Sequence, residues 1–357
     1  MTSSQPAARQ FPLNHVTQSF APLATTVKEM GLLNRSYGFY SGFGAALVLA
    51  LGGVITGFIL LGDSWFQLLM AAAFGIVLTQ VAFLAHEASH RTVLQSGPAN
   101  DRLGRFLSTV VVGISHQWWM SKHTRHHGNP NTIGKDPDIE KDTISFIEED
   151  AAQAKGIVRA ITKRQGWLFF PLLTLEGLNL HYRSVASLVT GGTRRQKWTE
   201  LPAIALHFGL YLVPVFLVLP LGMAFAFIGI QMAVFGVYMG ASFAPNHKGM
   251  TIIPEGVRVD FLSKQVLTSR NISGGWPMSI LMGGLNFQIE HHLFPNMARP
   301  HLVKAREIVR EHCETVGLPY TETTLLKSYG IVVEYLNRVG LAARDPFDCP
   351  ERVAFGR

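Results

Sequence analysis

The chain has 357 residues, of which 48% are apolar and only 15% are charged, and its mean hydropathy is +0.21. This length allows two soluble domains or one membrane domain with cytosolic extensions, and the scarcity of charge favours the membrane domain. The formal net charge of +7 is explained by basic loops beside an anionic membrane surface. We therefore expect membrane lipid, and no nucleic acid, as a partner.

The N-terminal residues 1–37 are polar and contain no apolar run that resembles a cleaved signal peptide. We expect them to form a cytosolic segment. The membrane domain is then expected to occupy residues 38–302, and its first apolar hairpin should act as the targeting signal.

Two long stretches with almost no charge predict four membrane-spanning helices. Between Tyr40 and Ala85 the only charged residue is Asp63, and between Leu201 and His247 there is none. Each stretch is about twice the roughly 20 residues that cross a bilayer, so each should form a helical hairpin. The predicted spans are residues 40–61, 66–84, 201–219 and 222–243.

The distribution of basic residues predicts the orientation of these spans. Fifteen Lys and Arg lie between His86 and Glu200, whereas neither hairpin turn carries one. By the positive-inside rule, the central region and both termini should face the cytoplasm. The predicted fold class is therefore an all-α integral membrane protein with two hairpins and a cytosolic helical cap.

Two further helical segments are expected outside the spans. Asp101–Trp119 has helical apolar spacing and ends in two tryptophans, so we expect one helix at the membrane interface. Residues 303–357 are expected to form a cytosolic helical tail, which continues a helix that runs from Arg299 to Gly317.

Seven of the fourteen histidines lie in three short clusters. Imidazole is a common metal ligand near neutral pH, and one zinc ion needs only three or four ligands. Seven histidines therefore indicate two metals, and the cap of the predicted fold would carry all three clusters. The clusters are His86-Glu-Ala-Ser-His90, His123-Thr-Arg-His126-His127 and Gln288-Ile-Glu-His291-His292.

The spacing within each cluster suits helical ligands. His86 and His90 are four residues apart and share one face of a helix, and His123 shares a face with both His126 and His127. The adjacent His291 and His292 diverge by about 100° on a helix, so they are placed to serve different metals.

Other polar residues near the clusters are candidates for the same site. His247 follows the last span and is expected to be an eighth histidine ligand, and Gln288 is expected to bind a metal or a metal-bound water. Asn246, Asp136 and Asp138 are candidates for orienting the ligands through hydrogen bonds, although turn and cap roles are equally compatible with the sequence.

The three clusters resemble the HxxxH, HxxHH and QxxHH boxes of the membrane fatty-acid desaturases, in the order and at the separations typical of that family. The resemblance covers about Tyr40 to Leu302, and the glutamine at Gln288 is most similar to the front-end group. The chain has no His-Pro-Gly-Gly haem motif of the fused b-type cytochrome domain found in many eukaryotic members. Because bacterial members commonly lack that domain too, we expect the inner membrane of a bacterium.

The resemblance implies a di-iron site with O2 as co-substrate and a fatty acyl chain, carried by coenzyme A or by a lipid, as substrate. Electrons are expected from a separate donor such as a ferredoxin, a b-type cytochrome or a flavin reductase. The same histidines also bind zinc, so heterologous expression is expected to allow zinc as a substitute.

Two other enzyme classes remain open at this point. Hydroxylases, carotenoid ketolases and alkane monooxygenases also use histidine boxes, and only the product distinguishes them from a desaturase. In addition, His86-Glu87-x-x-His90 fits the HExxH pattern of zinc proteases, with Glu87 as general base. The protease alternative leaves the second and third clusters unexplained.

Overall fold

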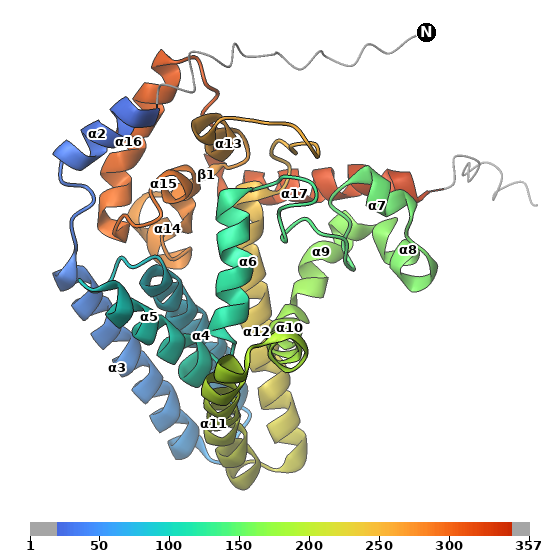
Figure 1. The fold of residues 1–357 in the computed structure, drawn as a ribbon. Helices are drawn as coiled ribbons and strands as arrows, with labels where there is room; N and C mark the ends of the chain where they lie inside the picture. Colours follow the sequence, from blue (N-terminus) through green and yellow to red (C-terminus); the bar gives the residue numbers. More distant parts are fainter. Residues whose placement is uncertain (1–19, 345–357) are drawn as a thin grey trace, which may run out of the picture.

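Four long apolar helices run side by side and form one end of the molecule (Figure 1). The computed structural model describes residues 20–344. Each of the four is long and apolar enough to cross a bilayer, so the predicted all-α membrane class with four spanning helices is confirmed. They are α3 (Tyr37–Leu61), α4 (Gln67–Ser89), α11 (Arg194–Val218) and α12 (Leu221–His247).

The spans are joined in pairs by short turns, as the sequence predicts. After α3, Gly62 takes a positive φ of 53° that L side chains rarely adopt. Gln67 then donates from Nε2 to the carbonyls of Phe58 and Gly62, at 2.7 and 2.8 Å. Because carbonyls at a helix end have no partner within the helix, this side chain satisfies groups that lipid could not.

Close approach of backbones holds the bundle together around α12. A Cβ added at Gly75 of α4 would lie 2.8 Å from the carbonyl oxygen of Gln231, and one at Gly236 would lie 2.4 Å from that of Leu173. Small residues at such crossings let membrane helices pack by van der Waals contact, which replaces the hydrophobic effect inside lipid.

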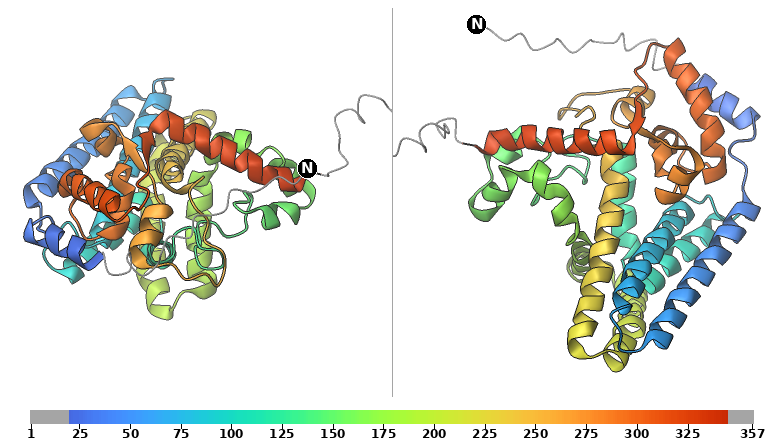
Figure 2. Two further views of the ribbon diagram at one scale, coloured as in Figure 1. Left: turned by 90° about the horizontal axis from the view of Figure 1, so that it is seen from above. Right: turned by 180° about the vertical axis from the view of Figure 1, so that it is seen from behind.

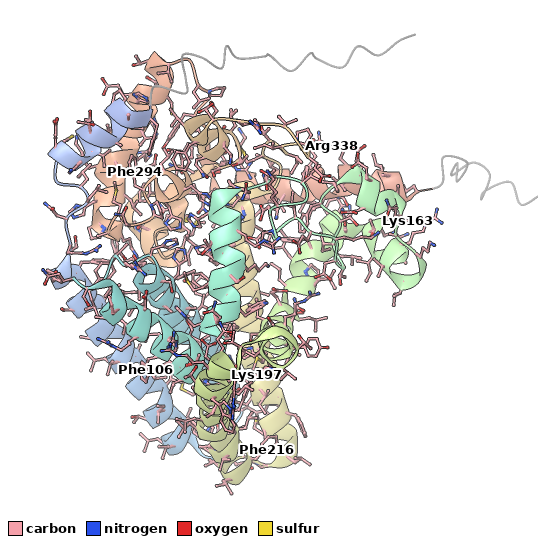
Figure 3. The ribbon with its side chains drawn as sticks, viewed as in Figure 1. Phe106, Lys163, Lys197, Phe216, Phe294 and Arg338 are labelled. Atoms are coloured by element: carbon pink, nitrogen blue, oxygen red, sulfur yellow. The ribbon has the colours of Figure 1, made fainter. Side chains whose placement is uncertain are left out.

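The remaining elements form a cap at one end of the spans, together with flanking helices (Figures 1 and 2). In Figure 3, Phe294 lies in this cap and Phe216 lies near the opposite end of the bundle. The elements are α2 (Phe20–Glu29), α5 (Gly97–Phe106), α6 (His116–Gly128), α7 (Glu148–Ala152), α8 (Gly156–Thr162), α9 (Gln165–Leu173), α10 (Glu176–Gly191), α13 (Phe261–Leu267), β1 (Asn271–Ser273), α14 (Gly275–Leu281), α15 (Gln288–Leu293), α16 (Arg299–Thr315), β2 (Glu322–Thr324) and α17 (Leu325–Gly340).

One predicted helix is wrong. The segment Asp101–Trp119 is not a single helix: α5 continues into a π-helical stretch, Leu107–Val112, and stops at Gly113, whose φ is +85°. A new helix, α6, then begins after Ser115, whose side chain accepts a hydrogen bond from Trp118 N at 3.1 Å. The two tryptophans therefore belong to the helix that carries the second histidine cluster.

The C-terminal part is helical as expected. Helix α16 begins at Arg299 and ends two residues before Gly317, whose φ is +69°. Its apolar face packs against α2 and the segment around Phe287–Leu293. A three-residue parallel ladder pairs β1 with β2 ahead of α17. Residues 345–357 of the expected tail lie outside the described part of the chain.

Two glycines of α12 give a direct test of this packing. We expect Gly236→Ala to destabilise the protein by about 1–3 kcal/mol, because the new Cβ would collide with backbone atoms of the segment that joins α9 and α10. Gly229→Ala is the matched control, since nothing lies within 4 Å of a Cβ there. Thermal unfolding in detergent checks the difference, and equal melting temperatures would contradict the close approach.

Candidate metal centre

Four elements carry the histidines of all three clusters and His247 to one place beneath the cap. Helix α4 continues beyond its apolar part to His86 and is capped by His90, and α12 continues to His247. The second cluster lies on α6 and the third on the short helix α15. The ends of two spans and two cap helices therefore meet at the junction between bundle and cap.

The eight histidines form two adjacent groups. Within each group, ligand nitrogens lie within 4.8 Å of one another. Sequence neighbours are divided between the groups, since His127 and His291 belong to the first and His126 and His292 to the second. The first group is His86, His90, His123, His127 and His291, and the second is His126, His247 and His292.

The nitrogens of the first group point at one another rather than at ordinary hydrogen-bond partners. Nε2 of His90 lies 2.7 Å from Nε2 of His123. Both ring nitrogens of His86 and of His127 are buried without a hydrogen-bond partner, as is Nε2 of His291. Buried polar atoms normally have partners, because leaving one unpaired costs several kcal/mol. A bound metal would satisfy one nitrogen of each of these rings, so these residues fit a metal.

Histidines of the second group, unlike most of the first, have hydrogen-bond partners outside the group. Nδ1 of His126 lies 3.0 and 3.1 Å from the carboxylate oxygens of Asp136, and Asp138 is 3.4 Å from the same nitrogen. Asp136 is fully buried and also accepts from the backbone N–H of Asn131 and of Asp138. Such a carboxylate fixes the orientation and tautomer of a ligating imidazole.

Gln288 and Asn246, which the sequence suggests as further parts of the site, lie beside His247. The Gln288 amide is 2.9 Å from Nε2 of His247, and Asn246 Nδ2 donates to Gln288 Oε1 at 3.2 Å. Nδ1 of His247 lies 2.9 Å from the carbonyl oxygen of Thr268. Because Nδ1 is engaged in this way, Nε2 is left to face Gln288 and His126.

Gln265 is a contributor that the sequence does not reveal. Its Oε1 is 2.9 Å from Nδ1 of His292, and its Nε2 donates to the carbonyl of His127 at 2.9 Å. One buried amide thus contacts both groups. Its position on α13, in a segment without histidines, gives no signal in a single sequence.

Burial sets the protonation of most of these rings. It lowers the pKa of His90 to about 4. Burial, followed by the neighbouring imidazoles, lowers the pKa of His127 and of His292 well below the ordinary value. For His126 burial also acts to lower the pKa, but Asp138 and Asp136 outweigh it and raise the pKa. The cluster therefore presents mainly neutral imidazoles, which is the form that binds metals.

The two glutamates inside the histidine clusters have other partners. Glu87 accepts from Tyr40 Oη and from Arg299 Nε, each at 3.0 Å, and it forms a second, very short contact with Arg299 Nη2. Glu290 accepts from Asn271 Nδ2 at 2.7 Å and from Tyr320 Oη at 2.8 Å, and burial raises its pKa to about 7. Neither carboxylate is among the grouped ligands.

Buried imidazoles in two adjacent groups at the end of four membrane spans define an integral membrane protein with a histidine-rich metal site. Residues 63–324 match the sequence model of the family described as Fatty acid desaturase, and because this is most of the chain, the protein belongs to that family. It is thus an oxidoreductase of the desaturase type.

Several named desaturases are similar to most of the chain. Delta(8)-fatty-acid desaturase 2 of Arabidopsis thaliana is 25% identical over 353 residues, which are 94% of this chain and 78% of the relative. Delta(6)-fatty-acid desaturase fat-3 of Caenorhabditis elegans is 27% identical, over 91% and 75% of the two chains. Delta 8-(E)-sphingolipid desaturase of Lachancea kluyveri is 27% identical, over 78% and 52%. The predicted resemblance to the front-end group is confirmed.

Family membership and the contacts of Glu87 both argue against the protease alternative. A zinc protease would need Glu87 free to act on a metal-bound water, yet both of its carboxylate oxygens are engaged by Arg299. The first cluster therefore fits the HExxH pattern only because its two histidines have helical ligand spacing. Its glutamate pairs with Arg299 instead.

The role of Asp136 can be tested without any assay of activity. We expect Asp136→Asn to weaken metal binding by roughly 10–100-fold, because the amide cannot supply the charge that orients His126. Asp142→Asn is the control, since this half-exposed carboxylate pairs with Arg183 and not with the cluster. Metal titration of the apoprotein, after size exclusion has verified the fold, measures both. Equal affinities would show that Asp136 does not support the site.

Proposed function

We propose that this protein is an O2-dependent fatty acyl desaturase that introduces a C=C double bond at a two-iron centre. The observation that carries the proposal is the convergence of eight histidines, six buried and two half-buried, in two adjacent groups at the ends of membrane spans. We assign the five histidines around His86 to one metal, and His126, His247 and His292, with Gln288, to the other. Asn246, Asp136 and Asp138 orient these ligands.

Each part of the chain then has a separate task. The irons, when bound, supply with O2 and two electrons the oxidising power that removes two vicinal hydrogens from the acyl chain. The overall balance is one –CH2–CH2– unit, one O2, two electrons and two protons giving –CH=CH– and two waters. Asp136, Gln265 and the Thr268 carbonyl hold the rings in place. The cap excludes bulk water, which protects a strong oxidant from side reactions.

The partners follow from this balance. The two electrons come from a separate carrier, such as a ferredoxin, a b-type cytochrome or a flavin reductase, and the acyl chain arrives on coenzyme A or on a lipid. We place the cap and both termini in the cytoplasm of a bacterial inner membrane, an orientation supported by the basic residues between the hairpins. The named relatives are eukaryotic and do not support this choice of membrane.

The reaction is tested by fatty-acid profiling of cells that express the protein, with suitable acyl substrates and a donor present. We expect a new double bond with the wild type and its loss with His126→Ala, which removes a ligand of the second group. His301→Ala is the control, because this histidine contacts Ser36 and lies outside both groups. A hydroxylated product would favour the hydroxylase alternative, and profiles equal to an empty vector would refute desaturation.

The number of metals gives an independent prediction. The purified protein should hold about two metal ions per chain, because eight histidines exceed what one ion can use. Zinc is an expected substitute after heterologous expression. We expect His292→Ala to lose about one ion per chain while His301→Ala loses none. A single ion that survives His292→Ala, measured by elemental analysis, would contradict the two-metal assignment.

A further inference from the structure

Helix α14 (Gly275–Leu281) is an apolar helix with no buried residue. Trp276 is 72% exposed, and Ile280 and Leu281 are 47% and 44% exposed. A contiguous apolar surface of this kind normally marks a contact with a partner or a membrane. Its short sequence, Gly-Trp-Pro-Met-Ser-Ile-Leu, has no charged side chain that would favour water.

Contacts with the spans place α14 at membrane depth. Gln80 Nε2 donates to the carbonyl of Ile280 at 3.0 Å, and Tyr238 Oη donates to that of Leu281 at 2.7 Å. Gln80 Nε2 also lies 2.5 Å from Tyr238 Oη. Gln80 lies within the predicted span 66–84 and Tyr238 within the span 222–243, four and five residues before their cytoplasmic ends. The exposed face of α14 therefore continues the lipid-facing surface of α4 and α12.

Both ends of α14 are glycine pairs in conformations that favour glycine. Gly274 and Gly275 have φ of 144° and 65°, and Gly283 and Gly284 have φ of 60° and 85°. Positive φ is sterically costly for residues with a Cβ. Two such pairs allow the helix between them to change direction with little resistance, as hinge segments do.

The second glycine pair reaches the metal centre. Gly283 and Gly284 line a cavity together with His86 and His291. Gly283 also packs on the ring of Phe83, which lies one helical turn before His86. The cavity has a volume of about 10 Å³. That is room for roughly one water and not for an acyl chain, so an acyl chain can reach the histidines through this cavity only if an element around it moves.

We propose that α14 is a gate at the edge of the cap, with its exposed apolar face in the membrane, through which an acyl chain passes sideways from the bilayer to the five-histidine group. The glycine pairs are its hinges, and Gln80 and Tyr238 form a latch that holds it closed by hydrogen bonds to its last carbonyls. This inference rests on the proposed function, because it specifies how the acyl substrate of that site arrives. It assigns the bilayer, rather than water, as the source of the chain.

The depth of α14 is tested by spin labelling in lipid nanodiscs. Cys313 is buried and burial raises its pKa to about 12, so it should not react, and Cys349 is replaced by Ser. A nitroxide on Trp276→Cys should collide with O2, which concentrates in lipid, several-fold more than with a water-soluble nickel chelate. Glu311→Cys, on the exposed face of α16, should show the reverse. Identical behaviour at both positions would overturn the placement.

The gate is tested by locking it. A bifunctional thiol-reactive crosslinker with a cleavable disulfide in its spacer, attached to Gln80→Cys and Ile280→Cys, should tie α14 to α4. Each single variant, treated in the same way, controls for the lost side chain. With a phospholipid that carries a photoreactive acyl chain, we expect at least tenfold less labelling of the locked protein, restored by reductant. The same photoreactive chain on coenzyme A, supplied from water, forms the second arm.

The outcomes separate the alternatives. Equal labelling of locked and reduced protein would overturn the gate, and loss of labelling in the lipid arm alone or in both arms would support it. Strong labelling from coenzyme A that the lock does not affect, with no labelling from lipid, would assign water as the source. Neither readout requires turnover, so a protein that labels as expected but makes no double bond would contradict the proposed function and not the gate.

Discussion

The convergence of eight imidazoles, six of them buried, in one place is the constraint on which the rest of the fold depends. Their nitrogens lose water, and several of them have no hydrogen-bond partner among residues 20–344. Such a cluster is costly unless metal ions satisfy it. The ends of α4 and α12 must therefore bring their histidines to the same place as the histidines of α6 and α15. A cap of helices has to cover the junction, because the charge of bound metals is poorly tolerated in lipid and water would quench their chemistry.

Placement of the rings depends on a second layer of residues that bind no metal. Asp136, Gln265 and the Thr268 carbonyl each engage the nitrogen of a histidine that faces away from the cluster. Arg270, almost fully buried, donates to the carbonyls of Pro245 and Lys248 on either side of His247. Carbonyls at a helix end have no partner within the helix, and Ser328 Oγ also donates to the Pro245 carbonyl at 2.7 Å. The guanidinium and this hydroxyl together fix the backbone that presents His247.

The spans and the histidine positions were predictable because both depend on local rules. Long stretches without charge identify membrane helices, and spacings of three or four identify ligands on one helical face. The interruption at Gly113 was not predictable, since the apolar pattern of residues 101–119 continues through it and only the backbone conformation ends the helix. The role of Gln265 was not predictable for another reason, because its contact with His292 joins residues 27 positions apart in the sequence.

The contact between Glu87 and Arg299 connects these layers. Both side chains are almost fully buried, and Tyr40 and the rings of Phe39 and Phe43 complete their surroundings. Removing two charges from water costs about as much as their attraction returns, so a buried pair adds little net stability. Its value is geometric: it joins α3, α4 and α16 beside His86, and an apolar pair of the same volume would not fix their relative rotation. A metal site assembled from distant segments needs such an alignment, because its ligands must converge before any metal binds.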